Sequence, residues 1–261
     1  MKKASIFRYQ ADRVPVAIIL AMSAIDFSMY FFVDNLYILT GYFALMVLPK
    51  WYICAWNHHH QHTPTFNKIG LNRILEFFYA LHTGITTNLW LLHHVFGHHK
   101  NFLNQEKDES RWKRKSGKKM GVIEYTFNVT ITAYYRGYIV GRRYPKHQKN
   151  YIVYSLVTLL ILTILVALKP MAGILLFALP MLLGLIGTSF VTYDHHAGLS
   201  THNEFEASRN DLSKFHNLIS GNLGYHTAHH HKQGLHWSLL PELHEQIKNK
   251  IPQNLVKNQT I

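Results

Sequence analysis

The chain has 261 residues, of which 48% are hydrophobic and 16% are charged, against roughly 25% charged residues in soluble domains. Lys and Arg outnumber Asp and Glu by 27 to 14, which gives a formal net charge of +13, and 20 residues are His. This composition excludes a disordered chain. The single cysteine excludes an internal disulfide framework and a cysteine-rich zinc or iron–sulfur site.

Four long apolar stretches predict four membrane-spanning helices. They cover residues 14–32, 36–54, 151–168 and 171–191, and each approaches the length of about 20 apolar residues that crosses a bilayer. Residues 33–35 join the first pair and residues 169–170 join the second, so we expect two helical hairpins. Buried helices of a soluble protein are the weaker alternative, because uncharged runs of this length are rare in soluble domains.

The distribution of basic residues predicts the orientation in the membrane. Four basic residues precede the first span, residues 100–149 form the most basic stretch, and the hairpin tips carry little charge beyond Lys169. Because Lys and Arg gather on the cytoplasmic side of membrane proteins, we expect both termini and the long middle segment in the cytoplasm. This topology explains most of the positive charge, and no nucleic-acid-binding motif accompanies it.

The interrupted apolar stretches 73–92 and 121–141 predict helices in or near the membrane interface. The basic run 111–119 is interpreted first as a consequence of topology and anionic lipid. An anionic headgroup and an acidic electron donor are its alternative partners.

The histidines gather in clusters that each follow an apolar stretch or lie near the C-terminus. Residues three or four apart share one face of a helix. His58 and His62 are therefore expected to face one metal, as are His94 and His98, whereas His99 points about 100° away. Imidazole is a common ligand of iron, zinc, copper and nickel. The clusters occupy residues 57–62, 93–99, 193–198 and 226–231.

A loosely structured metal-storage tract is the alternative interpretation of these clusters. Storage tracts are contiguous, whereas these clusters are spread over about 170 residues. The sequence contains no His-Glu-x-x-His motif and no Glu-x-x-His motif, which argues against a zinc protease and a carboxylate-bridged iron bundle.

The hairpins and the histidine boxes together resemble the membrane fatty acid desaturase and hydroxylase superfamily. The resemblance runs from the first span to about Leu243 and includes the Leu-Pro that follows the last box. It implies an all-α integral membrane fold, with four transmembrane helices in two hairpins and a cytoplasmic helical cap that carries the boxes. Residues 1–261 are then a single membrane desaturase-like domain, with the cap at 57–150 and 192–261.

In that superfamily the boxes hold two irons, with no catalytic residue separate from the metal centre. At the end of the fourth span, the sequence YDHHAGL resembles the pattern with a His two residues before a Gly, which favours His196 over His195. The implied ligands are His58, His62, His94, His98, His99, His196, His226, His229 and His230. A register shift of one residue would exchange some of them for His59, His60, His93, His195 or His231.

Ligating imidazoles usually donate their second N–H to a carboxylate or a carbonyl. Asp194, next to the His195–His196 pair, is one expected group of this kind. In some members of the superfamily an Asn near the last box approaches an iron through water, and Asn222 lies four residues before His226. Further candidate carboxylates are Glu106, Asp108 and Glu206.

The resemblance implies O2-dependent oxidation of an unactivated C–H bond in a lipid or fatty-acyl chain, with desaturation as the leading reaction. Hydroxylation of a fatty acid, alkane or carotenoid-like substrate by a monooxygenase is the first alternative. A non-enzymatic membrane metal-binding or transport protein is the second. The sequence has no cytochrome, flavin or ferredoxin signature, so we expect a separate electron donor of the ferredoxin, rubredoxin or b-type cytochrome class. The expected location is a bacterial inner membrane.

Overall fold

The computed structural model describes residues 5–258, so Lys2 and Lys3, two of the N-terminal basic residues, lie outside the described range. The chain divides into two compact units. The first comprises the residues up to His60, Pro64–Asn88 and Lys146–Leu185, and the second comprises Gln61–Thr63, Leu89–Pro145 and the residues from Ile186 onwards.

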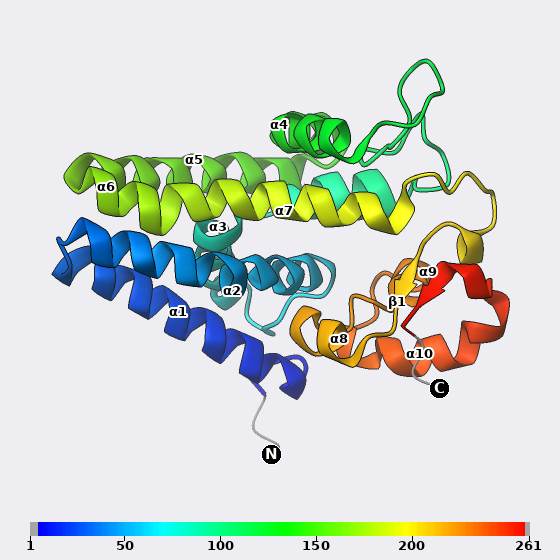
Figure 1. The fold of residues 1–261 in the computed structure, drawn as a ribbon, viewed down its shortest axis with the longest axis horizontal. Helices are drawn as coiled ribbons and strands as arrows, with labels where there is room; N and C mark the ends of the chain where they lie inside the picture. The colour runs from blue at the N-terminus through cyan, green and yellow to red at the C-terminus, as the bar shows by residue number, and fades with distance from the viewer. Residues whose placement is uncertain (1–4, 259–261) are drawn as a thin grey trace. The chain divides into compact units, whose positions relative to one another are not determined.

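Helices make up the first unit (Figure 1). The hairpin of α1 and α2 and the hairpin formed by α5 and the segment from α6 to α7 are the two predicted from sequence. The bounds are α1 (Arg13–Phe32), α2 (Leu36–His62), α3 (Ile69–Thr83), α5 (Pro145–Leu168), α6 (Pro170–Gly173) and α7 (Leu179–His196). A short 3-10 turn (Gln10–Asp12) precedes α1, and a π-helical segment (Ile174–Ala178) joins α6 to α7.

All four predicted spans are confirmed as helices that are long and apolar enough to cross a membrane. Those helices run over Gln10–Phe32, Leu36–His62, Pro145–Leu168 and Pro170–His196. Two of them continue past the C-terminal ends of the predicted apolar runs, to His62 and His196. Backbone hydrogen bonds extend a helix whether its side chains are apolar or polar. As a result, the first and third histidine clusters lie at helix ends.

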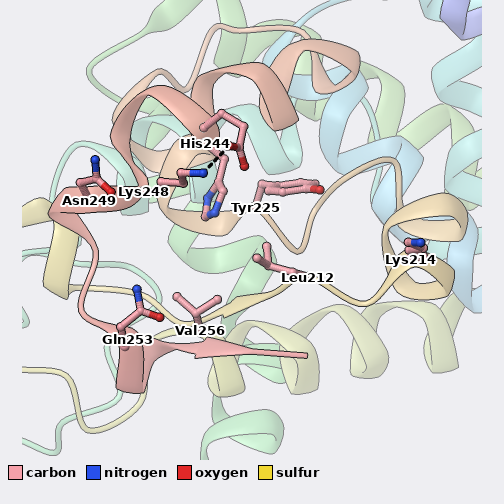
Figure 2. Close-up of a pocket in the computed structure, with 9 residues that line it drawn as sticks. Leu212, Lys214, Tyr225, His244, Lys248, Asn249, Gln253 and Val256 are labelled. Atoms are coloured by element: carbon pink, nitrogen blue, oxygen red, sulfur yellow. Dashed lines mark hydrogen bonds and ion pairs between the residues drawn. The ribbon is translucent and has the colours of Figure 1, made fainter. Parts of the chain in front are cut away.

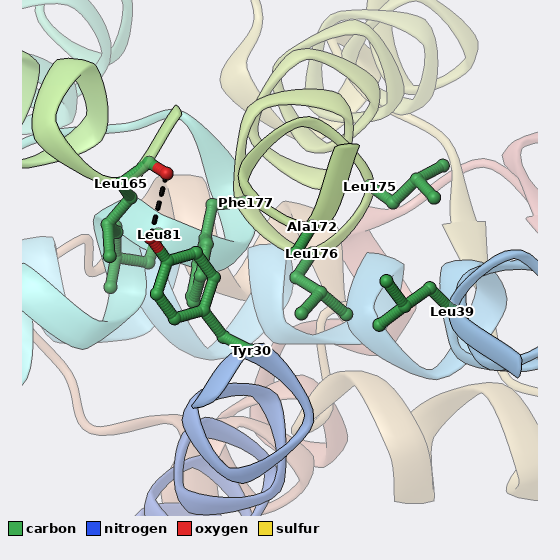
Figure 3. Close-up of a cluster of buried hydrophobic side chains, with 8 residues drawn as sticks. All are labelled: Tyr30, Leu39, Leu81, Leu165, Ala172, Leu175, Leu176 and Phe177. Atoms are coloured by element: carbon green, nitrogen blue, oxygen red, sulfur yellow. Dashed lines mark hydrogen bonds between the residues drawn. The ribbon is translucent and has the colours of Figure 1, made fainter. Parts of the chain in front are cut away.

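An apolar cluster joins the two hairpins within the first unit (Figure 3). The Tyr30 ring lies beside Phe177, with ring centroids 5.8 Å apart, and its hydroxyl donates to the Leu165 carbonyl at 2.8 Å. Gly173 allows the close approach of α6 to α5, since a Cβ there would lie 2.7 Å from the Val166 Cα. The buried members are Tyr30, Leu39, Leu81, Leu165, Ala172, Leu175, Leu176 and Phe177.

A buried charge pair connects the first two spans. The Lys50 Nζ lies 2.8 Å from the Asp26 Oδ1, and these side chains are 4% and 1% exposed. Tyr42 donates to the same carboxylate at 2.7 Å, and Lys50 also donates to the Leu176 carbonyl at 3.2 Å. A charge inside a membrane span is costly unless it is paired. The pair therefore ties α1, α2 and the second hairpin to one arrangement.

We predict that removing one member of this pair destabilises the protein more than removing both. Lys50→Met leaves Asp26 as an uncompensated buried charge, which should lower the free energy of unfolding by about 3–5 kcal/mol. For a chain of this size that is a fall in Tm of roughly 6–20 °C, measured by thermal unfolding in detergent. The double variant Asp26→Asn/Lys50→Met should recover most of the loss.

The matched control is Asp34→Asn, which removes the Lys169–Asp34 ion pair at 2.8 Å. The Asp34 side chain is 85% exposed, so the change should stay within about 1 kcal/mol. A double variant less stable than Lys50→Met would contradict the assignment.

The second unit contains shorter elements. They are a π-helical segment (Leu91–His99), α4 (Val122–Gly141), the end of α7, α8 (Lys214–Ser220), α9 (His226–His231) and α10 (Leu240–Ile247). Its 3-10 turns are Glu204–Glu206, Trp237–Leu239, Lys248–Lys250 and Gln253–Leu255. Strands β1 (Asn210–Asp211) and β2 (Val256–Lys257) pair in parallel, with Asn210 opposite Val256.

Two apolar clusters stabilise this unit. Ala228 of α9 packs with Leu240, Leu243 and Ile247 of α10, which fixes the helix that carries the last histidine box. Trp112, Met120, Tyr125, Val129 and Ala197 form the other cluster. The predicted helix 121–141 is confirmed as α4, whereas the predicted stretch 73–92 ends early as α3, because Gly84 adopts a left-handed C-cap with a φ of 66°.

A polar pocket of about 460 Å³ also lies in this unit (Figure 2). The His244 ring projects into it from α10, above Leu212 and Val256. Lys214 and Lys248 line the same pocket, and Lys248 pairs with Glu245 at 2.6 Å. Burial and the nearby Lys248 lower the pKa of His244.

Candidate metal centre

Four of the predicted ligands from three segments form one group in the second unit. His62 ends α2, His94 and His99 lie on the π-helical segment, and His229 lies on α9. One ring nitrogen from each falls within 4.8 Å of those of the others, and the Nε2 atoms of His94 and His99 are 3.0 Å apart. His58 lies one turn before His62 on the same helix.

His98, His196 and His230 form a second group, again with ring nitrogens within 4.8 Å of one another. The Nε2 atoms of His98 and His196 are 3.2 Å apart. His226 borders this group, because its Nε2 lies 3.0 Å from the Nε2 of His196. The structure therefore separates the clustered histidines into two adjacent sets, as a two-metal centre requires.

The predicted pairing of His94 with His98 is wrong. The residues Leu91–His99 form a π-helix, whose hydrogen bonds join residues five apart rather than four. His94 and His99 consequently share a face, while His98 turns to the other group. On α9, the consecutive residues His229 and His230 also serve different groups, because neighbouring side chains on a helix point about 100° apart.

Hydrogen bonds at Nδ1 fix the orientation of two rings in the second group. The Nδ1 of His98 donates to the Asp108 Oδ1 at 2.8 Å, and the Nδ1 of His196 donates to the Ala207 carbonyl at 2.8 Å. An imidazole that carries its single proton on Nδ1 presents a lone pair at Nε2. Two lone pairs then face each other across 3.2 Å, an arrangement that a cation between them stabilises.

Unpartnered ring nitrogens support the same assignment. Among the described residues, neither ring nitrogen of His230 has a hydrogen-bond partner, and neither does the buried Nδ1 of His99 or His226. Burial, and then the neighbouring histidines, hold the pKa values of His99, His226 and His230 well below the usual range. These rings are therefore neutral at physiological pH, as metal ligands must be. The residues present fit a metal centre.

The five alternative histidines lie outside both groups. His195 stacks on His226, with centroids 3.8 Å apart, and His93 stacks on Trp90. His60 contacts Glu76 and Thr65, His231 pairs with Glu204, and the His59 ring lies near Trp56.

Of the candidate orienting groups, Asp108 accepts a hydrogen bond from His98, a histidine of the second group. Asp108 is 1% exposed, and its Oδ1 also accepts from the Ser110 N–H at 2.7 Å. Tyr125 of α4 donates to the Ser110 carbonyl and so holds this loop. Asp194 pairs with Lys257 at 3.2 Å and is 69% exposed, and Asn222 donates to the Trp237 carbonyl at 3.2 Å.

The sequence does not distinguish Asp108 from the other carboxylates, because an irregular loop separates the end of the π-helical segment at His99 from Asp108. The contribution of Ala207 could not be predicted from the sequence either, since every residue supplies a backbone carbonyl.

We predict that Asp108→Ala weakens metal binding by about 10–100-fold, because His98 loses the acceptor that orients it. Asp108→Asn, which keeps an acceptor oxygen, should lose less. Metal retention against increasing chelator concentration measures the effect. Asp194→Ala is the matched control and should bind as the wild type does. Equal losses in the two alanine variants would contradict the assignment.

The comparisons with known proteins agree with this geometry. A family model described as fatty acid desaturase matches residues 35–260, a range that contains every histidine of both groups. No curated protein and no solved structure gave a match. The chain therefore belongs to the fatty acid desaturase family.

Proposed function

We propose that this chain, an oxidoreductase by its family, is a di-iron, O2-dependent enzyme. It would oxidise an unactivated C–H bond in a lipid or fatty-acyl chain, with desaturation as the leading reaction. The observation that carries the metal assignment is the pair of Nε2 atoms of His98 and His196, which face each other at 3.2 Å while their Nδ1 atoms donate elsewhere.

The nine predicted histidines divide between the two ions. The ligands of one ion are His58, His62, His94, His99 and His229, and those of the other are His98, His196, His226 and His230. Imidazole suits iron, and the donor set contains no carboxylate. Two bound irons would combine O2 with two electrons. This chemistry would supply the oxidising power needed to remove hydrogen from an unactivated C–H bond.

The protein itself orients the histidine rings and encloses the site. Asp108 and the Ala207 carbonyl hold their two imidazoles in one tautomer, so Nε2 is available in both. His94, His98 and His229 are at most 2% exposed, which keeps bulk water away from the groups. A closed, dry site protects a reactive oxidant from side reactions.

The family and the candidate membrane spans support the proposed substrate class and location. The family implies a lipid substrate, and the chain has four candidate membrane helices, as expected of a multi-pass membrane protein. We propose that both termini and the metal centre face the cytoplasm of a bacterial inner membrane. The family match crosses both compact units, which supports one desaturase-like domain. A separate protein of the ferredoxin, rubredoxin or b-type cytochrome class supplies the electrons.

Metal analysis tests the di-iron assignment. Wild-type protein purified in detergent should contain about two irons per chain, and His98→Ala and His229→Ala should each lose metal. His231→Ala is the matched control, because His231 lies outside both groups and pairs with Glu204. Elemental analysis after iron-supplemented expression gives the result. A wild type without tightly bound metal would contradict the proposal.

Product analysis separates the two reactions. In cells that express the wild type, desaturation should yield a lipid that has lost two hydrogens, and His98→Ala should abolish it. A product that has gained one oxygen would assign hydroxylation instead. Mass spectrometry of extracted lipids distinguishes the two, and an iron-loaded protein that yields neither would support the non-enzymatic alternative.

A further inference from the structure

A basic groove of about 930 Å³ lies in the second unit. The term basic groove denotes the concavity that is lined by the cationic side chains of Arg111, Lys113, Arg114 and Lys115. Glu106 is the one acidic residue in its lining. Arg114 pairs with Glu124, whereas Lys115 forms no ion pair with any residue of the described range 5–258. The groove therefore carries a net positive charge that its own side chains do not neutralise.

The groove is built from segments that continue directly from the candidate ligands. Leu103 lines it four residues after His99, and Ser200 lines it four residues after His196. The Lys113 Nζ donates to the Ser200 hydroxyl at 2.8 Å, which joins the basic run to the segment that follows α7. A ligand in the groove would consequently sit on the chain segments that emerge from the metal groups.

Phe102 connects the groove to the second group of histidines. It precedes Leu103 in the chain, and its ring centroid lies 4.5 Å from that of His230. The corresponding distances to His196 and His98 are 6.3 and 6.4 Å. One side chain next to the groove lining thus contacts all three histidines of the second group.

We propose that the basic groove is the docking surface for a small acidic redox protein, with Phe102 as the packed contact between it and the second histidine group. This proposal rests on the proposed function. In each encounter one electron would leave the reduced donor, which is oxidised, and would reduce one ferric ion held by the histidines; no bond would form or break. Positive charge alone would equally suit an anionic lipid headgroup. The choice of a redox protein rests on Phe102, whose ring packs on the histidines of the second group from a position next to the groove lining and so offers a short path for an electron.

The first test measures binding and needs no metal. The probes are an acidic [2Fe–2S] ferredoxin, an acidic rubredoxin and the soluble domain of a b-type cytochrome, titrated against metal-free protein in detergent at low salt. At least one should bind the wild type. The variant Lys113→Glu/Lys115→Glu should weaken that binding about tenfold or more and reduce its salt dependence.

The control for this charge reversal is Lys214→Glu/Lys248→Glu, which makes the same change in net charge at the pocket of Figure 2. It should bind the probe as the wild type does. Equal weakening in the control, or a wild type that binds none of the three probes, would overturn the proposal. So would a groove variant that keeps donor binding and loses only its binding to phosphatidylglycerol vesicles, since that result assigns the groove to lipid.

The second test measures electron delivery to iron-loaded protein. Phe102→Ala should leave the Kd of the probe unchanged and slow oxidation of the reduced probe about tenfold, while Phe102→Tyr should restore the rate. Iron content is measured in each variant, so that loss of metal is recognised. An unchanged rate in Phe102→Ala would refute the role of Phe102.

Dithionite separates a failure of docking from a failure of the proposed function. This small reductant should reduce the wild type and all variants at similar rates, because it does not need the groove. If the iron-loaded wild type is not reduced even by dithionite, the proposed di-iron function fails, whatever the probes bind.

Discussion

The candidate metal centre depends on hydrogen bonds made by the ring nitrogens that do not face it. Asp108 and the Ala207 carbonyl accept from the Nδ1 atoms of His98 and His196, so the Nε2 lone pairs of the two rings converge. Without a cation, this convergence in a buried space is electrostatically unfavourable. The fold must therefore hold the rings in place by other means, and α4 does so in part, through the bond from Tyr125 to the Ser110 carbonyl.

Helix geometry explains how so many histidines can serve two sites. On α9, consecutive histidines diverge by about 100° and reach different groups. On the segment Leu91–His99, the wider turn of a π-helix brings His94 and His99 together and releases His98 to the second group. The change from α to π geometry thus alters which group each histidine joins without altering the sequence of the box. π-helical turns are often found at functional sites for this reason.

The first unit uses polar interactions differently. The pair of Asp26 and Lys50 lies within the candidate membrane helices, where an uncompensated charge is costly, and it fixes which faces of α1 and α2 meet. Leu, Phe and Tyr side chains then fill the space between the hairpins. In the second unit, the excess cations of the basic groove remain accessible to ions in solution or to a bound partner.

The sequence by itself determined the four membrane-length helices and the clusters from which the histidines of both groups come. Long apolar runs identify spans because a bilayer selects length and hydropathy. The choice of individual histidines within the clusters came from the resemblance of the boxes to the desaturase superfamily. Tertiary structure alone decided the pairing of His94 with His99, the choice of Asp108 over Asp194, and the contact of Phe102 with His230. These depend on a local change of helix type and on irregular loops, where separation along the chain no longer predicts separation in space.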